Sequence, residues 1–253
     1  MRLHRFYIPE LIGNQIEITI HSSELVNQLR HVLRLKACEE AILFDGSGSD
    51  YLVAINRFVE TDQAVFDVRE SMRSRFMPSR KTYLFAAVIK KDNFEFIVEK
   101  ATELGVTDII PVIAERSEKK AVNHERLIKI SIEASEQSGR GDVPIIHSIV
   151  DLKEAVSLFN REEIRNSNIE IRDKSEARNS KIEMIAFHTD GETFNQNDLS
   201  KDGPIAIFIG PEGGWSPEEI AMFHKNEISV RCLGPQVLRA ETAVIAALSK
   251  VLL

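Results

Sequence analysis

The sequence predicts an α/β protein in which a small β-rich domain precedes a larger domain with a mostly parallel sheet. Residues 1–72 alternate short β-like runs with turns, which is typical of a small β-barrel. From residue 82 onward, apolar runs alternate with helical stripes, and this pattern indicates helices on both faces of a parallel sheet. Near the C-terminus, two continuous apolar runs each precede a glycine loop and a helix, as strands buried on both faces do.

Size and composition fit a soluble globular protein with one large domain or two moderate ones. The chain has 253 residues, of which 43% are hydrophobic and 28% are charged. No apolar run approaches the roughly 18 residues that span a bilayer, and the first residues lack the apolar core of a secretory signal. Cys38 and Cys232 lie among apolar neighbours, so we expect reduced core thiols and a cytoplasmic location. No Cys or His spacing indicates a metal site.

The small domain, residues 1–72, is expected to contain one short helix among its strands. The predicted strands are 6–8, 15–20, 41–44, 51–55 and 64–68. The helix is capped by Ser22 or Ser23. Its predicted apolar face comprises Leu25, Leu29, Val32 and Leu33. The glycine-containing segment Asp45–Ser49 lies between two alternating strands, so we expect a hairpin turn there and not a nucleotide loop.

Charge is unevenly distributed along the chain. The net charge of −7 argues against a nucleic-acid partner, but global charge says little about a local patch. Residues 73–81 hold four basic and no acidic side chains, and composition alone favours a solvated linker. In the small domain, Arg2, His4, Arg5, Arg30, His31 and Arg34 could form a basic face; scattered solvated charges are the equal alternative.

The large domain, residues 82–253, is predicted to begin with a strand at 81–89 and a helix capped by Asp92 and closed by Gly105. The next expected elements are a strand at 106–114, a helix at 124–138 ended by Gly139 and Gly141, a short strand at 144–150 and a helix capped by Asp151. Residues 160–181 are polar and predict a surface insertion. A strand at 182–188 and a turn at 189–192 follow.

Two glycine loops close the domain. The loop 210–215 follows the strand 205–209, and after it Ser216, Pro217 and Glu219 predict a capping box. The loop 234–240 follows the strand 228–233. Together with the loop after His188, both would meet at one sheet edge, where α/β proteins bind ligands; functionless tight turns are the alternative.

The chemistry expected of these loops is recognition of a neutral heteroaromatic ring such as adenine, because they present bare backbone groups and few charges. Ile209, Trp215, Leu233 and Leu238 are expected to bury that ring. The phosphate-binding loop with Gly-Lys-Ser/Thr, the dinucleotide pattern G-x-G-x-x-G and the serine elbow G-x-S-x-G are all missing from the sequence.

The two loops carry a family resemblance. The segment 209–216, followed by 233–243, is similar to the signature of RsmE-type methyltransferases of the SPOUT superfamily. Segments 4–7, 31–36, 100–106 and 133–140 resemble the same family, so the likeness spans nearly the whole chain. The polar segment 160–181 lies outside it.

The resemblance implies a PUA-like barrel before an α/β domain with a deep C-terminal trefoil knot. It also implies S-adenosylmethionine as cofactor, a homodimer with the site at the subunit interface, and methylation of uridine N3 in 16S ribosomal RNA of the small subunit. The implied cofactor-binding residues are His188, Thr189, Ile209, Gly210, Pro211, Glu212, Gly213, Gly214, Leu233, Gly234, Val237, Leu238, Arg239, Thr242 and Ala243.

Removal of the N3 proton calls for a base or a cation beside the uracil oxygens. The carboxylates Glu103, Glu136, Glu212 and Glu241 and the cations Arg116, Arg140 and Arg239 are the candidates. The base stays open among them. Arg140 is the first choice for orienting RNA or stabilising charge, whereas Arg239 could instead hold its loop through Glu241. The RNA-binding candidates are Arg2, Arg5, Arg30, His31, Arg34, Arg73, Arg75 and Arg116.

Two alternatives remain at this point. One is a related methyltransferase that acts on transfer RNA or on a ribose 2′-hydroxyl. The other is a non-enzymatic RNA-binding assembly factor that keeps the knot for dimerisation and binds no S-adenosylmethionine.

Overall fold

The computed structural model describes residues 3–158, 182–199 and 203–253. The chain divides into two compact units, one of residues 1–77 and 135–143, the other of residues 78–134 and 144–253. The expected first domain ended at residue 72, but the strand there continues to Arg73 and the unit reaches Met77. No local pattern had indicated that Ser135–Val143 would join this unit. The expected insertion at 160–181 lies outside the described residues.

The first unit is built on a five-stranded sheet in the order β1-β3-β4-β5-β2. Its strands are β1 (Arg5–Tyr7), β2 (Glu17–His21), β3 (Glu40–Phe44), β4 (Ser49–Val59) and β5 (Gln63–Arg73). All five expected strands form, and β1 and β3 pair in parallel while the other neighbours are antiparallel. Phe44 pairs with Asp50, so the hairpin turn predicted between β3 and β4 is confirmed.

Two expectations about apolar residues in this unit were wrong. The helix α1 (Ser23–Asn27), capped by Ser22, continues as a π-helical turn, η1 (Gln28–Val32). A π turn holds more residues than an α turn, so the apolar stripe shifts and Val32 is 67% exposed. Cys38 is exposed in the turn before β3, where its φ is 69°, and so is not the expected core thiol. Cys232, the other expected core thiol, is half-buried.

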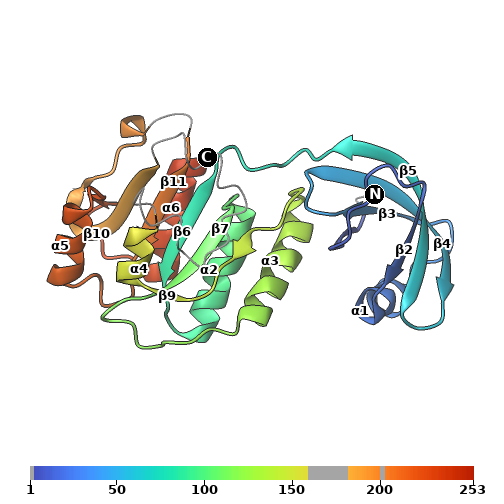
Figure 1. Ribbon diagram of the computed structural model, residues 1–253, viewed down its shortest axis with the longest axis horizontal. Coiled ribbons are helices and arrows are strands. Elements are labelled where there is room, and N and C mark those ends of the chain that lie inside the picture. The colour runs from blue at the N-terminus through green and yellow to red at the C-terminus, as the bar shows by residue number, and fades with distance from the viewer. Residues whose placement is uncertain (1–2, 159–181, 200–202) are drawn as a thin grey trace. The chain divides into compact units, whose positions relative to one another are not determined.

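The second unit contains a parallel sheet in the order β12-β10-β11-β6-β7-β8, with β9 also paired to β7 (Figure 1). Its strands are β6 (Thr82–Ala87), β7 (Asp108–Ile113), β8 (Ile145–Ile146), β9 (Val150–Asp151), β10 (Glu183–Thr193), β11 (Ile205–Ile209) and β12 (Ser229–Cys232). The predicted parallel sheet is confirmed. Because β10 lies between β11 and β12, the chain must cross it after leaving β11.

Helices cover both faces of this sheet (Figure 1). They are α2 (Lys91–Glu103), α3 (His124–Ser138, which ends in the first unit), α4 (Leu152–Ser157), α5 (Pro217–Lys225) and α6 (Ala240–Leu252), with a short 3₁₀ turn η2 (Gln196–Asp198). Leu84 packs in one buried cluster with residues of α2 and α6, whereas its neighbour Phe85 packs in a second cluster with residues of α4 and α5. Successive strand residues point to opposite faces, so the sheet is the middle layer.

Some element boundaries differ from the expected ones. Helix α2 begins at Lys91 after the cap residue Lys90, so Asp92 lies in the first turn and is not the cap. The predicted turn at 189–192 is part of β10, which continues to Thr193 with a register shift against β12. The predicted cap Asp151 is confirmed, since its side chain accepts from the Glu154 N–H. In the described part of the chain, no helix is long and apolar enough to cross a bilayer.

Candidate active site: a glycine-loop cavity

Three adjacent strands surround a cavity of about 360 Å³ in the second unit, two of them with their carboxyl ends and the third, β10, with its middle. The strands are β11, β10 and β12, and parallel strands that lie side by side release their loops at the same edge. We call this space the glycine-loop cavity. Its lining comes from the middle of β10, the loop after β11, the loop after β12 and the first turn of α6.

Most of the predicted cofactor residues line this cavity. They are His188, Thr189, Ile209, Gly210, Pro211, Glu212, Gly213, Gly214, Leu233, Gly234, Val237, Leu238 and Ala243. Arg239 and Thr242 do not line it; both are exposed, and Arg239 is the N-cap residue of α6. The prediction missed Phe187, Cys232, Gln236 and Ala240. Phe187 and Cys232 each precede a predicted residue, so extending the loops back by one position would have found them.

The buried Trp215 side chain fixes the position of the first glycine loop. Its indole Nε1 donates to the Phe187 carbonyl oxygen at 3.1 Å, and the side chain is buried. A Cβ on Gly210 would lie 3.1 Å from the Trp215 ring, so glycine is needed where the loop passes over the indole. Ile209, Leu233 and Leu238 line the cavity as expected, but the expectation that Trp215 would do so was wrong.

Arg116, placed by the segment after β7, braces the outer side of the same loop. Its Nη1 donates to the Gly213 carbonyl oxygen at 2.8 Å, and its aliphatic part would lie 3.3 Å from a Cβ on Gly213. Arg116 lines the cavity as well. The sequence had suggested this residue for RNA binding and as a catalytic cation, and the structure places its charge beside the cavity.

The predicted capping box after this loop is confirmed. Ser216 Oγ accepts from the Glu219 N–H at 3.3 Å, and Glu219 Oε2 accepts from the Ser216 N–H at 2.8 Å. The other carboxylate oxygen, Oε1, accepts from the Glu115 N–H at 2.8 Å. Glu219 is buried, so this one side chain ties the start of α5 to the segment after β7.

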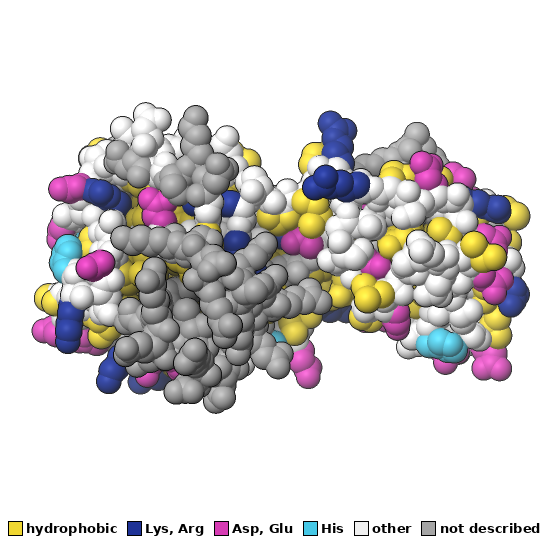
Figure 2. Space-filling view, turned by 45° about the horizontal axis from the view of Figure 1, so that its top comes forward, with side chains coloured by type: hydrophobic (Ala, Val, Ile, Leu, Met, Phe, Trp, Pro, Cys, Tyr) yellow, Lys and Arg dark blue, Asp and Glu magenta, His cyan; other side chains and the backbone are white. Residues whose placement is uncertain are grey.

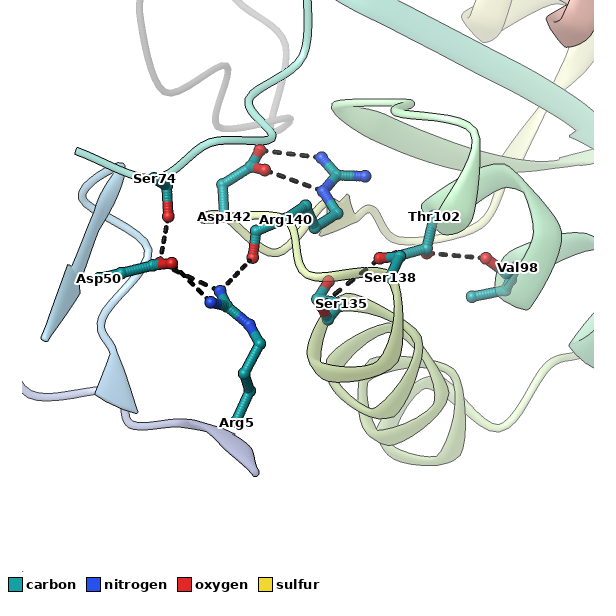
Figure 3. Close-up of polar contacts among 9 residues, drawn as sticks. All are labelled: Arg5, Asp50, Ser74, Val98, Thr102, Ser135, Ser138, Arg140 and Asp142. Atoms are coloured by element: carbon teal, nitrogen blue, oxygen red, sulfur yellow. Dashed lines mark hydrogen bonds and ion pairs between the residues drawn. The ribbon is translucent and has the colours of Figure 1, made fainter. Parts of the chain in front are cut away.

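The remaining catalytic candidates are engaged outside the glycine-loop cavity. Arg140 is 4% exposed and forms a bidentate pair with Asp142, at 2.8 and 2.9 Å (Figure 3). Glu136 Oε1 accepts from the Tyr7 N–H at 2.9 Å. Glu103 Oε1 accepts from Lys100 Nζ at 2.8 Å, and this hydrogen bond raises the pKa of Lys100. The structure therefore does not bring these residues to the cavity of their own chain.

Two other candidate carboxylates lie at or near the loops. Glu212 is exposed and lines the cavity. Glu241 lies in the first turn of α6, and its Oε2 is buried and has no hydrogen-bond partner among the described residues. Among the described residues, no ion pair joins Arg239 to Glu241. The alternative in which Arg239 holds its loop through Glu241 therefore finds no support.

Arg5 is a structural residue of the first unit, contrary to its expected contact with RNA phosphates. Its guanidinium is bidentate to Asp50 at 2.5 and 3.0 Å and also donates to the Arg140 carbonyl oxygen at 3.1 Å (Figure 3). Ser74 hydrogen-bonds to the same carboxylate. The Arg5 side chain is 11% exposed, which leaves little of it for a phosphate.

The other RNA-binding candidates of this unit lie at the surface. Arg30 lies over the Phe58 ring, and Arg75 lies over the Phe76 ring. The exposed candidates are Arg30, His31, Arg34, Arg73 and Arg75, and Arg2 lies outside the described residues. Acidic and basic side chains are interspersed on the face that Figure 2 shows. Among the described residues, no group of three or more His, Cys, Asp or Glu side chains is placed to hold a metal ion.

Comparison with known proteins assigns a class to this fold and site. A model of the RNA methyltransferase domain family matches residues 77–252, which covers the second unit and its glycine-loop cavity. The chain therefore contains an RNA methyltransferase domain.

Relatives that match this chain over nearly its full length define its family within the RNA methyltransferases. Ribosomal RNA small subunit methyltransferase E from Rickettsia conorii is 32% identical over 99% of this chain and 96% of its own length. The Bacillus subtilis protein of the same name is 29% identical over 98% of this chain and 96% of its own length. The chain belongs to the ribosomal RNA small subunit methyltransferase E family, as its motifs had indicated.

Solved structures agree. The Neisseria gonorrhoeae methyltransferase E, bound to S-adenosylmethionine, is 28% identical, has a TM-score of 0.81, and the match covers 98% of this chain and 96% of that one. A Legionella pneumophila structure, also in complex with S-adenosylmethionine, has a TM-score of 0.80 at 28% identity, with the same coverage of both chains.

Proposed function

We propose that this chain binds S-adenosylmethionine in the glycine-loop cavity and methylates N3 of a uridine in 16S ribosomal RNA of the small subunit. The observation that carries the proposal is the convergence of two glycine loops on one cavity, beside the middle of β10, lined by residues that the family motifs indicate. The two similar structures bound to S-adenosylmethionine support the choice of cofactor.

The residues of the cavity fit this cofactor. A space of about 360 Å³ lies within the range of small-molecule sites. Ile209, Leu233 and Leu238 supply apolar surface for an adenine ring, and the glycines of the first loop leave backbone N–H and C=O groups accessible for its polar edge. Glu212 is a carboxylate at the rim for the hydroxyl or ammonium groups of the nucleoside and amino-acid parts.

The cofactor supplies an electrophilic methyl group, and the chain supplies binding and charge. Uridine N3 must lose its proton as the methyl–nitrogen bond forms, because the neutral N3–H has no free lone pair for the methyl group. The Arg116 guanidinium donates to the Gly213 carbonyl oxygen beside the cavity, and it would stabilise negative charge that develops on the uracil oxygens. The general base stays open between the candidate carboxylates.

A homodimer would complete the site. Glu103, Glu136, Arg140 and Arg239 do not line the cavity of their own chain, so their proposed catalytic roles require a second copy. Val237 is 80% exposed on the loop that borders the cavity, and contact with another protomer would cover it. The unpartnered Oε2 of Glu241 would gain a donor in the same way.

The finer features of fold and location are part of the same proposal. The crossing of β10 between β11 and β12 supports a trefoil knot formed by the segment after β11. The first unit is proposed to be a PUA-like barrel that binds RNA through Arg30, His31, Arg34, Arg73 and Arg75. The protein would act in the cytoplasm, where small subunits are assembled.

The direct test is methyl transfer to purified small subunits. The protein is incubated with labelled S-adenosylmethionine and unmethylated subunits, and the modified nucleotide is located by primer extension. N3 methylation blocks Watson–Crick pairing and is expected to stop the polymerase at one uridine. Label transfer with read-through would point to a ribose 2′-hydroxyl, transfer to transfer RNA only would point to another substrate, and no transfer would contradict the enzyme itself.

A further inference from the structure

A second cavity, of about 700 Å³, adjoins the glycine-loop cavity in the same unit. It lies between the extended end of β10, the start of α5 and strand β12, and we call it the β12 cavity. The argument uses six of its lining residues: Arg116, His188, Trp215, Ile220, Val230 and Arg231. None of the residues that the proposed function assigns to the cofactor, apart from His188, lies in it.

Arg116 and His188 line both cavities, so these two side chains form the wall between them. The His188 ring lies near Gly214, where an added Cβ would be 3.6 Å from Nε2. Its Nδ1 accepts from the Asp190 N–H at 3.2 Å, which places the proton of a neutral ring on Nε2. Arg116 lies in the same way against Gly213. Because Gly213 and Gly214 have no side chains, Arg116 and His188 can pack against them, and the wall between the two cavities is one side chain thick.

The lining of the β12 cavity combines apolar surface with two guanidinium groups and with two carboxylates, Asp190 and Glu192, on the β10 side. Trp215, Ile220 and Val230 are aromatic or aliphatic, while Arg116 and Arg231 are cations. Arg231 is paired with Glu192, whose side chain is 83% exposed. The Arg231 side chain is 25% exposed, but its carboxylate partner is mostly in solvent, so a phosphate could replace the carboxylate at small cost. Apolar surface for a base beside an arginine for a phosphate is the combination that recognises a nucleotide.

We propose that the β12 cavity binds a nucleotide that flanks the methylated uridine in the RNA substrate, with its phosphate on Arg231. This rests on the proposed function, and it gives that site a means of selecting sequence. A nucleotide there would be separated from the cofactor by the Arg116–His188 wall, so it is a neighbour of the reacting base and not the base itself. The cavity is large enough for one nucleotide unit.

The test separates substrate binding from cofactor binding. Arg231→Gln removes the phosphate partner, and Ile220→Trp fills the cavity; neither residue lines the glycine-loop cavity. Lys225→Gln is the matched control, because Lys225 is an exposed cation of α5 that lines neither cavity. Each variant is assayed for S-adenosylmethionine Kd by calorimetry and for kcat and KM with small subunits.

Arg231→Gln is expected to raise KM for small subunits about tenfold, the effect of about one lost charged hydrogen bond. Ile220→Trp is expected to raise the same KM because the indole occupies the space of the nucleotide. The cofactor Kd and kcat should stay near those of the wild type, and Lys225→Gln should change nothing. An unchanged KM in Arg231→Gln would overturn the proposal, and so would a loss confined to kcat. Arg231→Gln alone decides the matter if Ile220→Trp does not fold.

A second readout distinguishes failure of this inference from failure of the proposed function. Uridine 5′-monophosphate, uridine and inorganic phosphate are titrated separately into the full chain and followed by NMR. We expect the monophosphate to bind most tightly and Arg231→Gln to weaken it about tenfold, whether or not the wild type transfers methyl groups. Equal binding of phosphate alone, or no effect of Arg231→Gln, would contradict the nucleotide site, while a flat S-adenosylmethionine titration would contradict only the proposed function.

Discussion

The indole Nε1 of Trp215 donates to the carbonyl oxygen of Phe187 at 3.1 Å, which joins the loop after β11 to strand β10, 28 residues earlier in the chain. This hydrogen bond fixes the loop after β11 against the middle of β10, and residues of both line the glycine-loop cavity. The geometry of the cavity therefore depends on a buried donor beneath it. The following predictions test this dependence and the assignments of charge around it.

Trp215→Phe is expected to destabilise the protein by about 1–3 kcal/mol, because the buried Phe187 carbonyl loses its donor. Cofactor affinity should fall with it, since the loop after β11 is no longer held against β10. Unfolding in urea gives the first quantity and calorimetry the second. Phe223→Leu is the control, since Phe223 packs edge-on against Trp215 without a hydrogen bond; it should lower stability and leave the affinity near that of the wild type.

Gly214→Ala is expected to weaken S-adenosylmethionine binding, because Gly214 has a φ of 68° and lines the cavity. The left-handed backbone costs alanine about 1–2 kcal/mol. Gly13→Ala is a matched control, with a φ of 56°, open space around its Cβ and a place in the other unit. The two variants should lose similar stability, and only Gly214→Ala should lose affinity for S-adenosylmethionine. Equal cofactor affinity in the two variants would contradict the site.

Asp108 should make the free energy of unfolding depend on pH under acidic conditions. Burial by itself raises the pKa of Asp108, but the hydrogen bond from His147 at 2.8 Å and the charge of Lys81 at 2.6 Å outweigh it and lower the pKa. A lowered folded-state pKa stabilises the fold above the unfolded value near 3.8, and this contribution is lost as the pH falls through the folded-state pKa.

Asp108→Asn is therefore expected to cost about 3 kcal/mol at pH 7 and to flatten the acid dependence. Urea unfolding between pH 7 and pH 3 measures both. Asp62→Asn serves as the control because Asp62 is exposed. A wild-type curve that is flat below pH 5, or an Asp108→Asn curve as steep as the wild type, would show that this carboxylate does not carry the dependence.

Substitutions at Arg5 and Arg34 should have different effects, because Arg5 is a structural arginine and Arg34 is a surface one. Arg5→Met is expected to destabilise the first unit by about 3 kcal/mol, because it leaves Asp50 without its ion pair. Reversing the charge in Arg34→Glu should weaken RNA binding, since Arg34 is exposed, without altering cofactor affinity. Denaturant unfolding and RNA binding at two salt concentrations distinguish them; a loss of both RNA and cofactor binding in Arg34→Glu would refute its assignment.

The sequence predicted the parts of the fold that local pattern determines. Apolar periodicity predicted the strands of both units, and the cap residues predicted the capping box at Ser216. The rule that adjacent parallel strands release their loops at one edge predicted that the glycine loops converge. Most of the cavity lining was found because the loops are contiguous segments that the motifs mark.

What the sequence could not indicate arises from contacts between distant residues. Arg5 pairs with Asp50, 45 positions away, and a charge pattern cannot distinguish such an arginine from a solvated one. Trp215 turned beneath its loop because the Phe187 carbonyl accepts its N–H, whereas hydrophobicity alone had suggested a place in the cavity. The π turn that exposes Val32 and the membership of Ser135–Val143 in the first unit likewise have no local signal.

Calorimetric titration of S-adenosylmethionine into the wild type and into Ala243→Phe tests the central claim most directly, because Ala243 lines the glycine-loop cavity and a phenyl ring would fill it. We predict saturable binding with one site per chain in the wild type and a Kd at least tenfold higher in the variant. A flat wild-type titration, or equal affinity when the cavity is filled, would contradict the account.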